Sequence, residues 1–450
     1  MTGHDDASQQ ERIARRTAAL GLLHQAAYAS SQLLATGIIS RAVAADQFGL
    51  WLTVFALTTW VPLLSIGQYA VLLTTLGSVA RRDRAAATRA YGASFAIAAS
   101  SACVVLAALL FGAPWTPWPA WLNADTPALA AMTTPVVMAM LGATLLAVPL
   151  TLMGFAVFAH QRGDLVHLAM ISGSVAGTLA LLLAAATHQP LWVLGATAVA
   201  GPLLGGLWIA WRHAGGRYLP RLALGQLHRS DVGTALKMGL ALAAADLLLF
   251  AIVRTPDLVV ARLHGLDAVG PFGAVGRVPV LLLAVFQALM LPYWPALADA
   301  VHQGDVRRVR RIAVRSLATI LGIWAAVSVV LVGWGLPLFR VWLGDGVQVQ
   351  QPLLVAACGQ SLGIGLLAWL MVVLNAQVRT RTLLATLAAA ACIYVALAVW
   401  LGLRSGPVGV AHGQVIGMLA ELLPVAAWQL RELLRAAARV AHAPVVGGRV

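Results

Sequence analysis

The sequence predicts an all-α polytopic membrane protein with about twelve transmembrane helices, and three observations lead to this prediction. Of the 450 residues, 60% are apolar and 10% are charged, whereas soluble domains carry about 25% charged residues. Apolar stretches long enough to cross a hydrocarbon core of ~30 Å recur from one end of the chain to the other. Basic residues stand in short clusters between these stretches. A soluble core could not cover so much apolar surface, whereas lipid can.

The first apolar stretch is expected to be a retained helix. It follows a polar segment with three arginines, is longer than the core of a signal peptide, and lacks a convincing cleavage site. Five prolines between residues 256 and 295 interrupt the region that is hardest to divide. Membrane helices tolerate prolines where neighbouring helices or water satisfy the freed carbonyls. The twelve expected spans are 17–39, 50–74, 91–112, 128–158, 165–187, 190–211, 233–261, 268–297, 312–335, 351–375, 382–402 and 407–430.

The distribution of basic residues favours an even number of helices with both termini in the cytoplasm. In that orientation the predicted cytoplasmic segments hold 24 of the 30 basic residues, and an odd number of spans would scramble the alternation. The net charge of +14 would suit a nucleic-acid-binding protein. The clustering between apolar stretches indicates topology and anchoring instead, so no nucleic-acid partner is expected.

The chain also resembles two copies of one unit. Arg41 followed by Phe48-Gly49 has a counterpart in Arg262 followed by Phe272-Gly273, and two further landmarks recur in the same order. The displacement between the copies lies between about 217 and 224 residues. We therefore expect a six-helix bundle over 1–211, a cytoplasmic connector over 212–232, a second six-helix bundle over 233–430, and a basic cytoplasmic tail over 431–450.

Motifs of soluble enzyme chemistry are absent from the sequence. It has no Gly-rich phosphate loop ending in Lys-Ser/Thr, no metalloprotease helix and no Gly-x-Ser-x-Gly elbow. Its three cysteines lie in separate apolar stretches without metal-ligand spacing. We therefore expect neither an enzyme nor a metal site, cofactor or disulfide.

Ionisable groups at membrane depth are the first candidates for function, because each costs roughly 2.5–3.5 kcal/mol on insertion scales. Asp246 and Asp257 are eleven residues apart, about three helical turns, and share nearly one face of 233–261. Arg254 lies close enough to pair with Asp257. These groups either line a hydrated cavity, where arginines hold an anion and a carboxylate carries a proton, or form structural pairs.

Two further sets of polar residues allow the same alternatives. His24, Tyr28 and Ser31 form a stripe on one face of 17–39, which favours a cavity wall over isolated structural hydrogen bonds. Gln414 and Glu421 share a face of 407–430, although Glu421 near the interface favours simple solvation. Arg277 at the start of 268–297 is ambiguous in the same way.

Three segments resemble a known family. The run from Gly37 through Arg41 to Trp51, the run from Asp257 through Arg262 to Gly273, and the stretch Leu374 to Arg379 are similar to polysaccharide-type flippases. These flippases belong to the multidrug/oligosaccharidyl-lipid/polysaccharide (MOP) exporter superfamily. The resemblance spans most of 17–430. Two positions differ from the usual pattern of the family. Pro271 occupies a position where a small or polar residue is usual, and Gly273-Ala274 stands where an aromatic residue is common.

The resemblance implies two pseudo-symmetric six-helix bundles around a central cavity that opens alternately to each side. It implies a bacterial inner-membrane flippase of the O-antigen type for a polyprenyl-diphosphate-linked oligosaccharide, used in lipopolysaccharide or other surface polysaccharide synthesis. Arg41, Asp257 and Arg262 are the positions carried over by motif. H⁺ or Na⁺ would be the coupling ion, with membrane lipid and polymerase or chain-length proteins as further partners. A cation-coupled multidrug exporter of the same superfamily and a membrane-embedded polymerase or ligase remain alternatives.

Overall fold

The described chain is built from α-helices, with one short 3₁₀ helix and no strand. This computed structural model describes residues 2–79, 83–113, 115–213, 215–216, 222, 225, 227–290, 293–376 and 380–441. Parts of the predicted connector 212–232 and of the predicted tail 431–450 lie outside these residues. The elements are α1 (Thr2–Ala42), α2 (Ala45–Thr58), η1 (Val61–Ser65), α3 (Gln68–Val79), α4 (Arg84–Gly112), α5 (Trp118–Trp121), α6 (Pro127–Ala159), α7 (Gly163–Ala186), α8 (Leu191–Val199), α9 (Gly201–His213), α10 (Arg229–His264), α11 (Leu266–Met290), α12 (Tyr293–His302), α13 (Val306–Leu343), α14 (Gln351–Ala376) and α15 (Thr380–Ala441).

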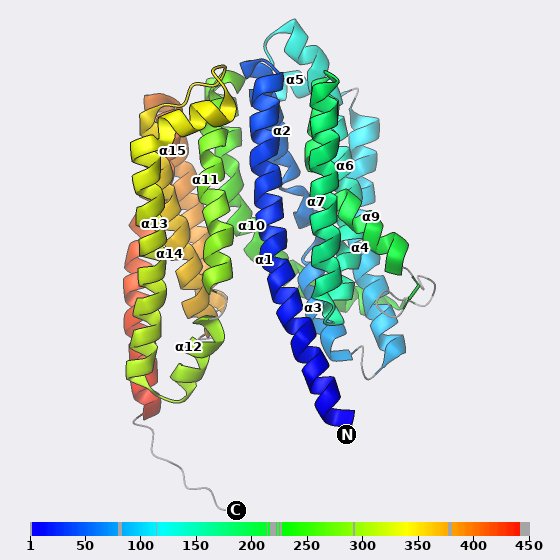
Figure 1. The fold of residues 1–450 in the computed structure, drawn as a ribbon, viewed down its shortest axis with the longest axis vertical. Coiled ribbons are helices and arrows are strands. Elements are labelled where there is room, and N and C mark those ends of the chain that lie inside the picture. Colours follow the sequence, from blue (N-terminus) through cyan, green and yellow to red (C-terminus); the bar gives the residue numbers. More distant parts are fainter. Residues whose placement is uncertain are drawn as a thin grey trace, which may run out of the picture. The chain divides into compact units, whose positions relative to one another are not determined.

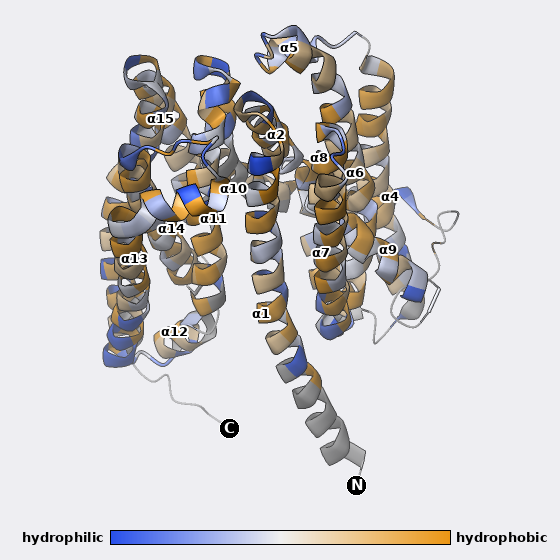
Figure 2. Cartoon of the chain, turned by 45° about the horizontal axis from the view of Figure 1, so that its top comes forward, coloured by the Kyte–Doolittle hydropathy of each residue, from blue (hydrophilic) through white to orange (hydrophobic). Residues whose placement is uncertain are grey.

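The helices confirm the predicted fold class of a polytopic all-α membrane protein. By length and composition, eight helices of the described chain could cross a membrane, or nine if the bent pair α8–α9 is one span. Residues coloured as hydrophobic prevail along these helices, and hydrophilic residues gather toward their ends (Figure 2). Ten of the twelve expected spans each fall on one helix or on consecutive shorter helices, and the last two, 382–402 and 407–430, both fall in α15.

Several spans are broken where the backbone leaves helical geometry. The span expected at 50–74 is divided by η1 and by a turn in which Ile66 and Gly67 have φ of 52° and 68°. The pair α8–α9 bends by 52°. In α15 the backbone breaks at Ser405 and Gly406, the latter with φ 68°, which falls in the gap predicted between the last two spans. Glycine accepts this positive φ without steric cost.

The described chain divides into two compact units. Unit 1 contains residues 1–250, 264–270 and 342–347, and unit 2 contains 251–263, 271–341 and 348–450. The two predicted bundles have different bounds and stay a prediction. The short segments 264–270 and 342–347 belong to unit 1, although the residues on either side of them, 251–263, 271–341 and 348–450, belong to unit 2.

Unit 1 is organised around α6, which packs against α2, α4, α8 and α9. The aromatic rings of Phe48, Trp51 and Phe55 follow one another along α2 with centroids 5.7–5.8 Å apart, and all three are buried. In α6, Met140 is fully buried. α1 packs mainly on α7, and the two helices lie side by side in Figure 1. Asp83 caps the N-terminus of α4, where the backbone N–H of Ala86 holds the pKa of its carboxyl below the usual range.

Unit 2 is organised around α14, which packs against α15 and α12. The indole N–H of Trp369 in α14 donates to the Ser316 hydroxyl oxygen of α13 at 3.1 Å. Trp369, Phe286 and Tyr394 are among the largest side chains that are fully buried. Small residues, aromatic rings and interhelical hydrogen bonds provide the packing, as expected where lipid offers no hydrophobic driving force between helices.

The contact of α7 with α9 predicts a packing-sensitive position at Gly173. A Cβ at this residue would lie 2.3 Å from the carbonyl oxygen of Gly201. We expect Gly173→Ala to lower the free energy of unfolding by about 1–3 kcal/mol, because the two backbones must move apart. Thermal unfolding in detergent measures this change.

Gly142→Ala in α6 is the matched control, because a Cβ at Gly142 meets no atom within 4 Å. Alanine favours a helix over glycine by up to about 1 kcal/mol, so the control should be neutral or stabilising. Equal melting temperatures for the two variants would contradict the close approach of α7 and α9.

Candidate functional site

Arg41 lies at the end of α1, where a segment distant in sequence is docked. The buried hydroxyl of Ser40 donates to the carbonyl oxygen of Leu343 at 2.9 Å. The indole N–H of Trp342 donates to the carbonyl oxygen of Leu33 at 2.8 Å. The aliphatic part of Arg41 packs over Gly344. Arg41 itself is exposed, so it stands at the surface of unit 1 on a rigid support.

The neighbouring Phe48-Gly49 pair of the repeated motif packs inside unit 1. Phe48 is fully buried, and a Cβ on Gly49 would lie 1.9 Å from the carbonyl oxygen of Leu266. Phe48 also lies against Gly270. The motif of the first half therefore contacts the segment 264–270, which leads into the motif of the second half. Its glycine permits a close backbone approach, and Arg41 is the member of this motif that reaches the surface.

A cluster of polar groups lies within unit 2 and includes two residues that the sequence singled out, Asp257 and Gln414. We call Asp257, Gln360, Tyr394 and Gln414 the polar cluster. The Gln414 amide N–H donates to the Tyr394 hydroxyl oxygen at 2.6 Å, and Gln414 in turn accepts from the Gln360 amide. Asp257 is half-buried and close enough to Tyr394 to interact with it electrostatically. The cluster thus joins α10, α14 and both parts of α15.

The other predicted residues of the second half fall in three situations. Arg262, near the end of α10, is exposed, and Arg277 in α11 is buried. The side chains of Asp246 and Arg254 lie outside the described side chains, so pairing of Arg254 with Asp257 stays a prediction. Gln360 and Tyr394 were missed by sequence reasoning. Their only signal was that each is a polar group inside an apolar stretch.

The polar stripe of α1 has its partners on α7. His24 Nδ1 lies 3.3 Å from His167 Nδ1, and the Ser31 and Thr178 hydroxyl oxygens are 2.8 Å apart. Tyr28, between them on α1, is 40% exposed. Two of the three residues of the stripe thus contribute to packing between α1 and α7, and whether they also line a transport cavity stays a prediction.

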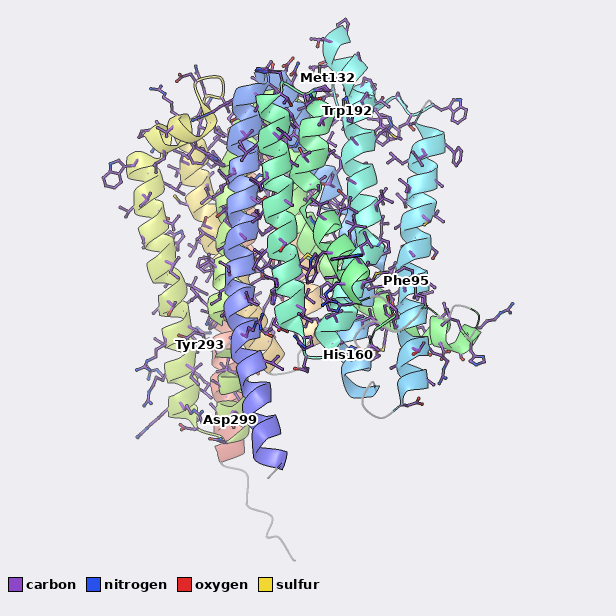
Figure 3. All side chains as sticks on the ribbon, turned by 45° about the vertical axis from the view of Figure 1, so that its right-hand side comes forward. Phe95, Met132, His160, Trp192, Tyr293 and Asp299 are labelled. Carbon is purple, nitrogen blue, oxygen red and sulfur yellow. The ribbon has the colours of Figure 1, made fainter. Side chains whose placement is uncertain are left out.

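An ion pair with a buried carboxylate lies at one end of the contact between α1 and α7. The Asp164 carboxylate, 2% exposed, accepts from Arg162 Nε at 2.9 Å and Nη2 at 3.1 Å, and Arg16 Nε lies 3.9 Å away. Figure 3 labels His160, which follows the last residue of α6 and lies four residues before Asp164. The pair therefore stands where α6 passes into α7. Arg162 is one of the basic residues that the sequence prediction assigns to the cytoplasmic segments, and that pattern does not indicate its partner.

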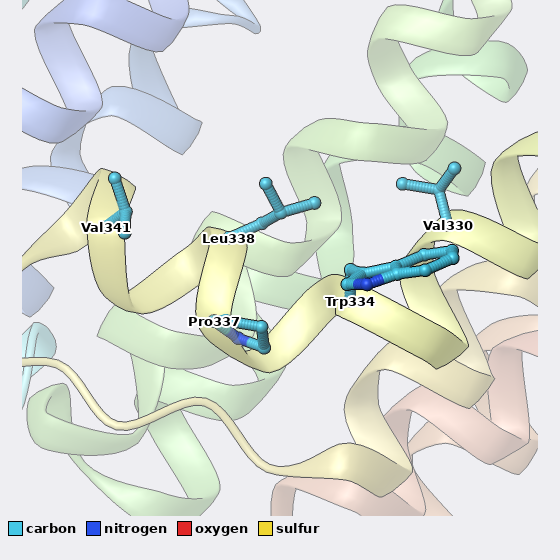
Figure 4. A pocket seen from close by; sticks show the side chains of 5 residues that line it. All are labelled: Val330, Trp334, Pro337, Leu338 and Val341. Carbon is cyan, nitrogen blue, oxygen red and sulfur yellow. The ribbon is translucent and has the colours of Figure 1, made fainter.

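The surface of α13 carries an apolar groove in unit 2. The groove has a volume of about 350 Å³. It is lined by aliphatic side chains and one indole ring (Figure 4). The lining residues are Val330, Trp334, Pro337, Leu338 and Val341. The groove can contact a hydrocarbon chain and offers no charged group that would hold a polar head. Among the described residues, no group of three or more His, Cys, Asp or Glu side chains could hold a metal ion.

No protein-family model matches the sequence, and no curated protein matches it. Solved structures do match the fold over nearly the full length. An inward-facing multidrug resistance MATE family transporter of the MOP superfamily matches with a TM-score of 0.72 at 16% identity, covering 91% of this chain and 96% of that one. A mutant of the Vibrio cholerae MATE transporter VcmN matches at 0.64 and 15%, covering 95% and 98%. The lipid II flippase MurJ in an inward closed conformation matches at 0.64 and 11%, covering 93% and 91%. The chain therefore has the fold of MOP superfamily transporters.

Proposed function

We propose that the protein is an inner-membrane flippase that moves a polyprenyl-diphosphate-linked oligosaccharide to the outer leaflet by alternating access. Both termini would lie in the cytoplasm, and H⁺ or Na⁺ would drive the cycle. Polymerase and chain-length proteins would act on the glycan after translocation. The fold shared with MOP transporters supports a transporter, and the similarity to a lipid II flippase supports a lipid-linked cargo.

The observation that carries the cargo assignment is the pair of exposed arginines at matching positions of the two halves. Arg41 occupies the last turn of α1, and Arg262 occupies the last turn of α10. A diphosphate and its sugars cannot cross hydrocarbon unaided, whereas guanidinium groups hold phosphate oxygens through charge-assisted, bidentate hydrogen bonds. The polyprenyl tail can remain in lipid during translocation. Apolar faces such as the groove on α13 are compatible with it.

A cation-coupled multidrug exporter is the second candidate, because two of the matched structures are MATE transporters. Such a protein needs carboxylates or aromatic groups that attract cationic drugs. The polar cluster with Asp257 would then bind the drug or the coupling ion in place of phosphate. The two candidates therefore predict opposite charge preferences for the cargo.

Reconstitution in proteoliposomes distinguishes the candidates. A fluorescent polyprenyl-diphosphate sugar is placed in both leaflets, and the fraction protected from a membrane-impermeant quencher or hydrolase is followed. Flippase activity is expected to exceed that of protein-free liposomes by at least about tenfold, since uncatalysed crossing requires a diphosphate in hydrocarbon. Export of a cationic dye with no effect on the lipid would exclude the flippase and favour the second candidate.

A further inference from the structure

Two histidines face each other in the contact between α1 and α7. The Nδ1 atoms of His24 and His167 lie 3.3 Å apart, with ring centroids 5.4 Å apart and planes inclined by 39°. A hydrogen bond at this distance requires one Nδ1 to carry a hydrogen and the other to present a lone pair. The packed arrangement therefore needs at least one neutral ring, in the tautomer that leaves its Nδ1 unprotonated.

The surroundings of the two rings are mostly apolar. A Cβ on Gly21 of α1 would lie 3.2 Å from His167 Nε2, so this ring covers the glycine. The ring of Phe158 meets His167 edge-on at 5.6 Å. From residue 17 to 40, α1 has no Asp, Glu, Lys or Arg, and Asp164 is the only charged residue of α7. Among the described side chains, the titratable and charged groups on or next to the elements packed around the contact are Arg16, Tyr28, Arg41, Asp46, His160, Arg162, Asp164, His188, Arg212 and His213.

Among the described side chains, the carboxylate near the pair is that of Asp164, and it already has basic partners. Asp164 lies one turn before His167, and its carboxylate is bound by Arg162 and approached by Arg16. An imidazolium in the packed contact would therefore gain little from Asp164 and would lose hydration. A proton on the accepting ring would remove the lone pair that the hydrogen bond needs and, once both rings are charged, bring two cations together in a medium of low dielectric constant. The doubly protonated pair is therefore the form that does not fit the packed contact.

We propose that His24 and His167 form a proton-binding site and that protonation of both rings separates α1 from α7. A first proton from the aqueous phase can add to the Nε2 lone pair of the donating ring and leave the hydrogen bond in place. A second proton adds to the Nδ1 lone pair that accepts the hydrogen bond, and the two imidazolium rings are better hydrated once α1 has moved away. The site thus links proton binding to the position of α1. The further inference that this proton is the coupling ion rests on the proposed transport function. The existence of the proton-binding site does not depend on that function.

Disulfide trapping between α1 and α7 tests the site directly. The Ser31 and Thr178 hydroxyl oxygens are 2.8 Å apart, two turns along α1 from His24, so S31C with T178C reports this contact. The background carries C103S, C358S and C392S, which removes the three native cysteines. The matched control adds H24N and H167Q, side chains that can hydrogen-bond and do not titrate in this range. Because thiol ionisation is the same in both proteins, the ratio of their cross-linking rates isolates the effect of the histidines.

The ratio of rates, histidine pair over amide pair, is expected to fall at least about fivefold from pH 8 to about pH 4.5. The range extends below the ordinary histidine pKa of about 6.5, because the packed contact disfavours two charged rings. The sign follows from the chemistry. A pair with at least one neutral ring holds α1 on α7 at the upper end of this range, and protonation of both rings releases α1 at the lower end. A ratio that is constant across this range would overturn the site.

Transport assays then test the coupling role separately. In proteoliposomes, the ratio of lipid translocation with a proton gradient to that without one is expected to fall to about one in H24N/H167Q. A pH-dependent cross-linking ratio with an unchanged gradient dependence would retain the site and reject its role as coupling site. Absence of lipid translocation in the parent protein would reject the proposed flippase function, and the cross-linking result would still decide the proton site.

Discussion

Replacing Gln414 with leucine is expected to disconnect the polar cluster and to lower both stability and transport. Gln414 is buried, donates to Tyr394 and accepts from Gln360. Leucine would leave the Tyr394 hydroxyl and the Gln360 amide without this partner inside the protein. Each buried polar group that loses its partner costs about 1–3 kcal/mol. The free energy of unfolding is therefore expected to fall by about 2–6 kcal/mol, measured by thermal or denaturant unfolding in detergent.

Gln287→Leu is the matched control, because Gln287 of α11 is exposed and the same atoms are exchanged. On an exposed face of a membrane helix, this change is expected to be neutral or stabilising. The pair of variants separates loss of the polar cluster from the general effect of removing an amide in a membrane. If Gln414→Leu melted at the same temperature as the parent, the hydrogen bonds among α14 and the two parts of α15 would carry no stability.

Neutralising Arg41 and Arg262 together is expected to abolish translocation of the diphosphate-linked lipid while leaving the fold intact. Both side chains are exposed, so glutamine at these positions removes no core packing. A hydrogen bond to a charged group contributes about 1.5–3 kcal/mol, so each lost arginine corresponds to at least about tenfold in apparent affinity. The double variant should therefore lose at least about a hundredfold in translocation at limiting substrate. The proteoliposome assay measures this loss directly.

Arg404→Gln provides the control for the loss of a basic residue. Arg404 stacks on the Trp400 ring at 4.3 Å and belongs to neither matching motif. Its loss is expected to leave translocation within about twofold, because a cation–π contact at an exposed site is worth about 0.5–1 kcal/mol and Arg404 is neither of the two arginines proposed to hold phosphate. Full activity of the Arg41 and Arg262 double variant would remove both arginines from the mechanism, even if the protein proved to be a flippase.

Local sequence patterns predicted the elements well, because crossing a bilayer is a requirement on each stretch of about twenty residues. The expected spans 17–39, 91–112 and 351–375 lie inside α1, α4 and α14. The gap expected between 402 and 407 coincides with the break at Ser405 and Gly406. The break at Ile66 and Gly67 was not expected. The apolar composition of 50–74 is the same whether the backbone is continuous or broken there.

Site residues were predicted less completely. The sequence reveals that a polar residue in an apolar stretch is costly to place in a membrane, but it does not reveal which residue this side chain contacts. Asp257 was singled out by composition, whereas its neighbours in the polar cluster come from helices more than a hundred residues away. His24 was interpreted as part of a cavity wall, and the structure gives it a histidine partner on α7. The repeated Phe-Gly motif was singled out by its recurrence, but its packing against Leu266 could not be inferred from the motif.

The sequence by itself determined that this protein lies in a membrane, that it is all-helical and where most of its spans lie. Hydropathy and helix-breaking residues are local properties of a span, so they can be recognised from neighbouring residues in the sequence. Only the tertiary structure decided which polar groups meet. His24 and His167 are 143 residues apart, and Gln68 reaches the carbonyl oxygen of Ala235 over 167 residues. Within lipid, a polar side chain finds its hydrogen-bond partner on another helix. Which helix lies beside it depends on how the helices pack, and the sequence of one span does not determine this.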